Sequence, residues 1–222
     1  MGNLGKIEKK SRQHTVYKDS NGKRVVGVTT VTGVMNKPAL VKWANGLGLR
    51  GIDSTTYVDA LAGVGTCAHL MVTDGLMDLS PDLGSFSRDQ IDLAENCVVK
   101  WHYWKDSHDL KPIFVEKPLV SDKYGYGGTC DIYCELDGKK TLIDLKTSKG
   151  IYDEMFTQVT AYGVLLKENG YDVEQAMIVR IGRNDDEGTE PEVKSITRSD
   201  LHWKRFQTCL ELYRLNNEIR KG

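Results

Sequence analysis

The sequence has no long hydrophobic segment. Among its 222 residues, no uninterrupted apolar run is long enough to cross a bilayer. The first ten residues also lack the apolar stretch of a secretory signal peptide. We therefore expect a cytoplasmic protein that does not interact with membranes.

The chain also has little net charge. Its 30 basic and 31 acidic residues give a formal net charge of -1, whereas nucleic-acid-binding proteins usually carry a basic stripe. A neutral protein can still contain a locally basic cleft, and the N-terminal segment of this chain is locally positive. Its basic residues are Lys6, Lys9, Lys10, Arg12, Lys23 and Arg24.

Cysteine is too sparse and too irregularly spaced for a disulfide framework, and the five cysteines are an odd number. Cys130 and Cys134 are predicted to share a strand face, where four residues of strand separate them by about 13 Å, too far for a disulfide. We expect reduced thiols in a hydrophobic core.

No linker rich in proline, glycine and serine divides the chain, which contains only five prolines. We therefore expect one domain over 1–222, of a size that can bury a sizeable core. Within it we distinguish a hairpin segment at 1–35, a helical region at 36–110 and a core at 111–222.

Turn and capping signals predict both helices and strands. Asn21-Gly22 predicts the turn of a hairpin over 14–34, whose second strand continues to Val31. Ser87 to Gln90 has the spacing of a capping box, and Gly170 is a predicted C′ glycine. The other expected elements are a helix that begins near 38 and is broken by the glycines at 46, 48 and 51, helices at about 54–72, 87–107, 153–169 and 200–219, and strands at 113–120, 128–136, 139–147, 173–181 and 192–197.

The most informative stretch is a predicted β-hairpin over 128–147 with Asp137-Gly138 at its turn. Asp-Gly suits a two-residue turn, because both central positions need positive φ. The resulting register places Asp131 directly opposite Asp144, where like charges are destabilising. Lys146 lies two residues beyond Asp144, so the period of two places it on the same strand face.

Two carboxylates and an ammonium on one strand face suit a hard divalent cation. Proteins usually hold Mg²⁺ with one or two carboxylates, together with water and phosphate oxygens. A lysine beside the cation can orient a water or offset phosphate charge. The alternative is a solvated strand face with an incidental ion pair.

Four other polar residues are ambiguous on their own. A lone helical histidine such as His69 is more often a core or surface residue than a ligand. Glu116 points toward the same site or lies at the surface. Gln158 and Tyr162 are i, i+4 neighbours on one helical face; Tyr162 is either a packing residue or, with Gln158, faces the carboxylates and a substrate backbone.

In combination and in order, these residues resemble the motifs of the PD-(D/E)XK nuclease superfamily. Within it they resemble the RecB-like branch, which includes the mitochondrial genome maintenance exonuclease and the CRISPR-associated adaptation nucleases. Each motif alone is weak, whereas their order along about 100 residues is more specific. The matching motifs are Gly65-x-x-x-His69, Glu116, Gly127-Gly128-Thr129-Cys130-Asp131, Asp144-Leu145-Lys146-Thr147-Ser148 and Gln158-x-x-x-Tyr162, together with an N-terminal segment that contains Val28-Thr29-Thr30-Val31 and Leu40-Val41-Lys42-Trp43.

The resemblance implies a mixed α/β (α+β) fold with a restriction-endonuclease-like core, a central mixed sheet flanked by helices, and an N-terminal helical region. Residues 111–222 would then be the catalytic core. The resemblance also implies that His69, Asp131, Asp144 and the backbone carbonyl of Leu145 bind a catalytic Mg²⁺ or Mn²⁺. Lys146 would position the attacking water and the scissile phosphate.

The resemblance further implies residues that contact DNA. Gln158 and Tyr162 would hold the DNA strand and support the site, and Thr147 and Ser148 would lie against the nucleic acid. Glu116 is an additional catalytic candidate.

The expected function is therefore that of a metal-dependent DNA exonuclease that releases 5′-phosphate products in recombination, repair or phage DNA processing. The exonuclease assignment rests on the resemblance. The alternatives are a structure-selective or flap endonuclease, a non-catalytic module of the same fold that binds nucleic acid or a protein, and a purely structural protein. Expected partners are single-stranded DNA or duplex ends and a recombination or replication protein, in a bacterial or phage-infected cell.

This chain departs from the resemblance in its cysteines. Several members of the branch bind a [4Fe-4S] cluster through one N-terminal cysteine and three cysteines near the C-terminus. Here only Cys209 follows the catalytic segment. We therefore expect no iron-sulfur cluster.

Overall fold

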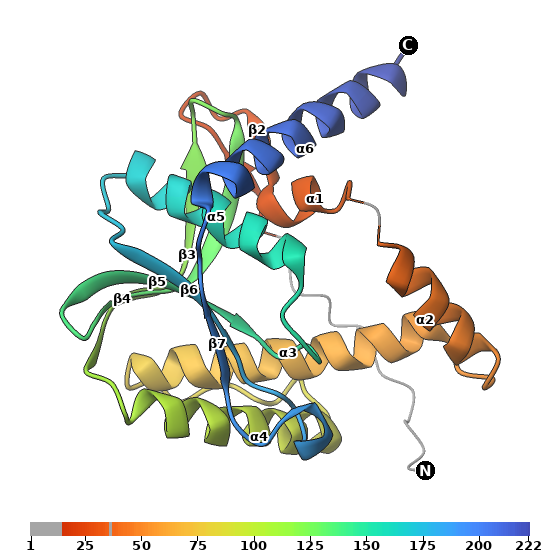
Figure 1. Ribbon diagram of the computed structural model, residues 1–222, viewed down its shortest axis with the longest axis vertical. Helices are drawn as coiled ribbons and strands as arrows, with labels where there is room; N and C mark the ends of the chain where they lie inside the picture. Colours follow the sequence, from red (N-terminus) through yellow and green to blue (C-terminus); the bar gives the residue numbers. More distant parts are fainter. Residues whose placement is uncertain (1–14, 36) are drawn as a thin grey trace.

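The computed structural model describes residues 15–35 and 37–222. Seven strands in these ranges form one mixed sheet (Figure 1). Its most connected strand is β4 (Tyr126–Leu136). This strand pairs antiparallel with β3 (Leu110–Ser121) and β5 (Lys139–Lys146), and parallel with β2 (Arg24–Gly27). The outer strands are β1 (Tyr17–Lys18) beside β2, β6 (Gln175–Arg180) parallel to β5, and β7 (Glu192–Ser195) antiparallel to β6.

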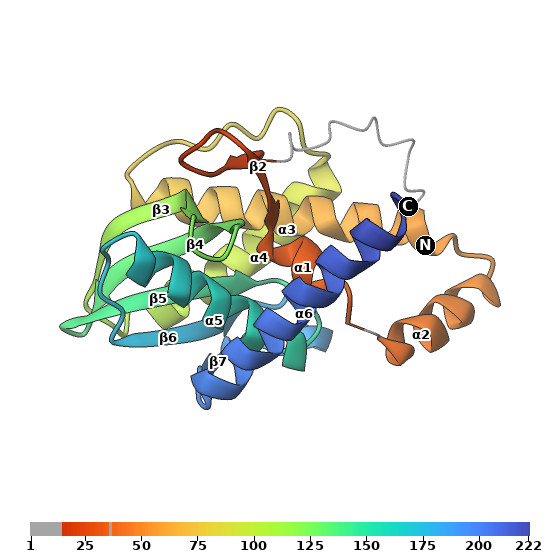
Figure 2. The ribbon, with the colours of Figure 1, turned by 90° about the horizontal axis from the view of Figure 1, so that it is seen from above.

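Helices cover both faces of the sheet (Figures 1 and 2). One face is covered by α3 (Ser54–Leu76) and α4 (Arg88–Lys105), and the other by α5 (Asp153–Glu168), α6 (Ser199–Ile219) and the short α1 (Val28–Thr32). The remaining helices are α2 (Pro38–Gly48) and the 3₁₀ helix η1 (Asp185–Glu187). Within the described ranges, no helix is both long and apolar enough to span a membrane. This architecture confirms the predicted mixed α/β fold class and is consistent with a restriction-endonuclease-like core.

Each face of the sheet has its own hydrophobic core. Under α3 and α4, the buried Trp101 packs in a cluster that contains Ile132 and Ile143. Under α5 and α6, Tyr126 and Phe206 are fully buried in a second cluster. Burial of each such side chain stabilises the fold by roughly 1.5–3 kcal/mol. Because both faces are covered, a polar side chain on a central strand needs a partner or a function.

Capping signals predicted one end each of α4 and α5, whereas α2 continues through Gly46 to Gly48, beyond the first glycine that was expected to break it. Ser87 Oγ accepts the N–H of Gln90 at 3.3 Å, and Gln90 Oε1 accepts the N–H of Ser87 at 3.0 Å, so α4 begins with the expected capping box. Gly170 follows α5 with a φ of 83°, which is the conformation expected of a C′ glycine. The predicted strands at 113–120, 128–136, 139–147, 173–181 and 192–197 correspond to β3 through β7.

One N-terminal expectation is wrong. The predicted hairpin forms between β1 and β2, with Gly22 at a φ of 76° in its turn, and residue 14 of its predicted range lies outside the described residues. However, Val28 and Val31, expected in its second strand, belong to α1. Their spacing of three residues lets one helical turn bury both, at 1% and 0% exposure. Tertiary packing therefore overrides the β propensity of valine.

Candidate metal centre

The β4–β5 hairpin is paired along only part of its length. The predicted register is confirmed for five residue pairs, the last of which is Ile132–Ile143. Beyond Ile143, β5 continues along β6, whereas the same edge of β4 next pairs with β2, near the start of β4. The two strands therefore diverge. We call this place the fork; it comprises Gly128–Asp131 of β4 and Asp144–Lys146 of β5.

The alternation of side chains is interrupted where β3 and β4 pass the fork. Glu116 has a left-handed backbone with a φ of 47°, and the β3–β4 ladder skips Glu116 and Asp131. Cys130 lies in the core under α5, whereas Ile132 and Cys134 lie in the core under α3. The prediction that Cys130 and Cys134 share a strand face is therefore wrong. Backbone distortions of this kind cluster at functional sites.

Three side chains of the kinds that bind metal ions meet at this distortion: His69 of α3, Glu116 of β3 and Asp131 of β4. His69 Nδ1 lies 3.8 Å from Glu116 Oε1 and 3.7 Å from Asp131 Oδ2. One ligand atom from each residue lies within 4.8 Å of the other two. Glu116, which the sequence left undecided, thus belongs to this cluster. An imidazole nitrogen and two carboxylate oxygens fit a divalent cation.

Asp131 accepts a hydrogen bond across the fork and has a raised pKa. Its Oδ2 accepts the N–H of Leu145 across the fork at 2.9 Å. Burial raises the pKa of Asp131 to about 6 against the opposing influence of His69, and the charge of Asp144 adds to the rise. Burial lowers the pKa of His69, but the nearby Asp131 and Glu116 carboxylates outweigh it and raise that pKa overall. The cluster therefore favours a bound proton or cation.

Asp144 and Lys146 lie on the β5 side of the fork. The Asp144 side chain is 2% exposed and forms an ion pair with the Lys146 ammonium, so the two residues share a strand face as predicted. Burial lowers the pKa of Lys146, but the charges of Asp144 and Asp131 outweigh it and raise that pKa overall. The predicted directly opposed pairing of Asp131 with Asp144 is wrong, because the ladder ends one pair earlier. Asp144 lies outside the three-residue cluster and acts on Asp131 through its charge.

Hydrogen-bonded side chains border the centre on the α5 side. Gln158 Nε2 donates to Tyr162 Oη at 3.1 Å and to Thr29 Oγ1 of α1 at 3.3 Å. Tyr162 is 7% exposed, and burial raises its pKa well above the usual value. A Cβ atom on Gly128 would lie 2.5 Å from Tyr162 Cε1, so only glycine admits the ring at this distance. The sequence did not reveal this role of Thr29, because α1 was expected to be a strand.

The two remaining predicted nucleic-acid contacts follow β5 directly. Thr147 packs against α3, where a Cβ atom on Gly65 would lie 2.9 Å from Thr147 Oγ1. Ser148 Oγ donates to the Gly150 carbonyl at 2.8 Å. Both side chains are half-buried, and their contact with nucleic acid stays a prediction.

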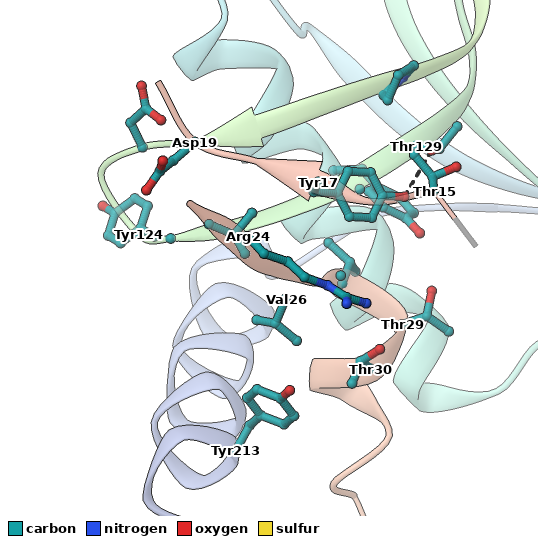
Figure 3. Close-up of a pocket in the computed structure, with 18 of the residues that line it drawn as sticks. Thr15, Tyr17, Asp19, Arg24, Val26, Thr29, Thr30, Tyr124, Thr129 and Tyr213 are labelled. Carbon is teal, nitrogen blue, oxygen red and sulfur yellow. Dashed lines mark hydrogen bonds between the residues drawn. The ribbon is translucent and has the colours of Figure 1, made fainter. Parts of the chain in front are cut away.

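A groove of about 1600 Å³ begins at this candidate metal centre and follows the β1–β2 hairpin (Figure 3). Glu116, Asp131 and Tyr162 line the end at the centre. Residues of β1, β2, the β3–β4 turn and α6 line the rest, including Tyr17, Arg24, Tyr124 and Tyr213. Of the basic N-terminal residues noted in the sequence, Lys23 and Arg24 line this groove, whereas Lys6, Lys9, Lys10 and Arg12 lie outside the described residues.

Comparison with known proteins gives weak likenesses. No known family model matches the sequence, and no curated protein matches it. A solved structure of an alkaline exonuclease (LHK-Exo) from Laribacter hongkongensis is similar with a TM-score of 0.39 and 14% identity, over 59% of this chain and 68% of that chain. The solved structure of SSO0001 is similar with a TM-score of 0.42 and 16% identity, over 88% of this chain and 78% of that chain. The site is therefore interpreted from its own geometry.

Proposed function

We propose that this protein is a divalent-metal-dependent nuclease that hydrolyses phosphodiester bonds of DNA. The observation that carries the proposal is the convergence of His69, Glu116 and Asp131 at one end of a groove, with the Asp144–Lys146 ion pair across the fork. Such donors suit a hard cation, and the lysine suits an anionic substrate. The resemblance of the motifs to PD-(D/E)XK nucleases supports DNA as the polymer.

In the proposed mechanism, His69, Glu116 and Asp131 would hold the cation, and Asp144 and the Leu145 carbonyl are further candidate ligands. A bound divalent cation supplies a Lewis acid that polarises the phosphate and lowers the pKa of a water. The Lys146 ammonium, which its neighbours keep charged, aligns that water and offsets the charge of the phosphate. The water oxygen loses a proton and bonds to phosphorus while the bond to the 3′ oxygen breaks and that oxygen takes up a proton, so the products are a 5′-phosphate and a 3′-hydroxyl.

Gln158 and Tyr162 are the proposed contacts for the nucleotide at the scissile bond. Their mutual hydrogen bond and the contact with Thr29 fix both side chains beside the centre. Thr147 and Ser148 are proposed as additional strand contacts. Exonuclease rather than endonuclease activity is supported by the RecB-like order of the motifs.

A time course on 5′- and 3′-labelled single- and double-stranded oligonucleotides tests this proposal, with Mg²⁺, Mn²⁺ or a chelator. We expect cleavage that the chelator stops and that Asp131→Asn abolishes. Lys139→Ala is the matched control, because Lys139 is an exposed residue at the paired end of β5. Failure of the wild-type protein to cleave any substrate with either metal, or full activity of Asp131→Asn, contradicts the proposal.

Circular single-stranded DNA separates the two modes of cleavage. A strict exonuclease leaves the circle intact, because the circle has no end. Cutting of the circle would replace the exonuclease assignment with an endonuclease.

A further inference from the structure

The β1–β2 hairpin forms a fixed wall of the groove. β2 pairs with β4 at Tyr126 and Gly127, directly before the fork. Tyr17 Oη is hydrogen-bonded to Thr129 Oγ1 of the fork at 2.9 Å. The Tyr17 ring also lies against the backbone of β4, since a Cβ atom on Gly127 would lie 2.5 Å from Tyr17 Cγ. Side chains on this wall are therefore held at a defined place relative to the metal centre.

Most charged side chains at the far end of the groove are already engaged. Asp19 Oδ1 accepts the N–H groups of Asn21 and Lys23 at 3.0 and 2.8 Å, and Asp122 Oδ1 accepts the N–H of Ser20 at 2.9 Å. These carboxylates order the β1–β2 turn and fasten it to the β3–β4 turn. Two of the basic side chains are engaged as well: the Arg214 guanidinium donates to the Tyr124 carbonyl, and the Lys123 ammonium lies 4.9 Å from the centroid of the Tyr124 ring.

Arg24 differs from these residues. Its side chain is exposed and points into the groove, where Tyr17 and Thr29 are also part of the lining (Figure 3). Among the described residues, its guanidinium has no hydrogen-bond or ion-pair partner. Tyr213 of α6 lines the same groove and presents an aromatic ring to it.

An unpaired guanidinium in a groove that ends at carboxylates suits a phosphate. Arginine binds phosphate oxygens in a bidentate way, and its charge offsets the repulsion that acidic residues exert on an incoming polyanion. Tyr17 and Tyr213 line the same groove, and aromatic rings beside a cation that binds the backbone are typical of proteins that follow a nucleic-acid strand.

We propose that Arg24 binds a backbone phosphate of the DNA strand other than the scissile phosphate, and thereby positions the strand in the groove. This inference rests on the proposed nuclease function and names a contact outside the metal centre. It therefore predicts a dependence on substrate length, because only a substrate that extends along the groove reaches Arg24.

The test compares two substrates and two binding conditions. A labelled oligonucleotide of about twelve nucleotides extends along the groove, whereas the p-nitrophenyl ester of thymidine 5′-monophosphate reaches only the centre. For Arg24→Ala we expect about tenfold weaker oligonucleotide binding in EDTA and a salt slope reduced by about one. Its kcat/KM for the oligonucleotide falls by a similar factor, while hydrolysis of the small ester keeps the wild-type rate.

Two further variants complete the test. Arg24→Glu should weaken binding more than Arg24→Ala, and Arg88→Ala, which removes an exposed arginine of α4 outside the groove, should behave as wild type. Wild-type oligonucleotide binding by Arg24→Ala, or an equal loss on both substrates, overturns the role of Arg24. If the wild-type protein cleaves neither substrate, the nuclease proposal fails, while the binding data in EDTA still decide on Arg24.

Discussion

Near its turn, the β4–β5 hairpin is a regular antiparallel ladder with buried apolar residues such as Ile132 and Ile143, whereas beyond Ile143 the strands separate. The paired half contributes to the core under α3 and α4. The separated half carries Asp131, Asp144 and Lys146, which are charged groups with restricted access to water. One pair of strands thus supplies stability in one half and perturbed ionisable groups in the other.

The two halves differ in how their side chains affect the stability of the fold. A carboxylate whose charge is disfavoured by burial and by a second carboxylate reduces stability in the absence of a cation. Such an arrangement is expected at a site selected for function rather than for stability. Changes in the separated half should therefore affect mainly the rate of cleavage, and changes in the paired half should affect mainly the stability of the fold.

The largest expected effect is that of Lys146→Ala. Loss of the ammonium that aligns the water should lower the rate of cleavage about 10³-fold, whereas Lys139→Ala at the other end of β5 should keep the wild-type rate. Steady-state assays with Mg²⁺ measure both. An active Lys146→Ala protein would remove Lys146 from the mechanism.

Folding of this variant needs its own control, because Asp144 loses its counter-ion. The double variant Lys146→Ala/Asp144→Asn removes both charges, so it should recover stability in thermal melts without recovering activity. Recovery of activity would contradict the assigned role of the ion pair.

In the paired half, Ile143→Ala should lower the free energy of unfolding by about 3 kcal/mol, because it leaves a cavity at a fully buried position. Urea denaturation measures this loss. Binding of Mn²⁺ to the folded variant should match wild type at low temperature. Loss of metal binding by the folded variant would show that the two halves are not separable.

Asp131→Asn should raise the free energy of unfolding, whereas Ile143→Ala lowers it. At pH 7.5 without metal, the wild-type carboxylate is charged although its folded pKa is raised to about 6, so its removal should stabilise the fold by about 2 kcal/mol. Below the folded pKa the wild-type carboxyl is protonated, and the gain should shrink toward zero as the pH falls from 6 to 4. Denaturation at pH 7.5 and pH 5 measures the difference, and destabilisation at pH 7.5 would contradict it.

The smallest expected effect is a pH dependence of metal affinity. A cation must displace the proton of Asp131 and that of His69, whose pKa is also raised, so the affinity for Mn²⁺ should rise at least tenfold from pH 5 to pH 7. Electron paramagnetic resonance of free Mn²⁺ measures this directly. An affinity that is constant over this range would mean that Asp131 is not a ligand.

The paired and separated halves of the hairpin also differ in how far they could be predicted from the sequence. The Asp137-Gly138 turn, with φ values of 50° and 81°, fixes the register of the paired half, and local turn chemistry is sufficient to predict it. The fork forms because β5 separates from β4 beyond Ile143 while it stays paired with β6. This pairing depends on contacts between elements that are distant in the sequence. The same turn register placed Asp131 opposite Asp144, and this prediction fails because the β4–β5 ladder ends at Ile132–Ile143.

The candidate residues were therefore easier to predict than their arrangement. Asp131, which the predicted hairpin indicated, lies beside His69, which the resemblance indicated, and Glu116 joins them although the sequence left its direction open. Thr29 could not be placed, because Val28 and Val31 have β propensity and fold into a helix only through their packing. Contacts between distant elements, rather than local propensity, decide these positions.

Calorimetric titration of the protein with Mn²⁺ tests the central claim most directly. The account predicts stoichiometric binding to the wild-type protein and to Lys139→Ala, and loss of this binding in Asp131→Asn and in His69→Ala. Absence of stoichiometric binding to the wild-type protein, or binding that both site variants retain, would contradict a metal centre at the fork.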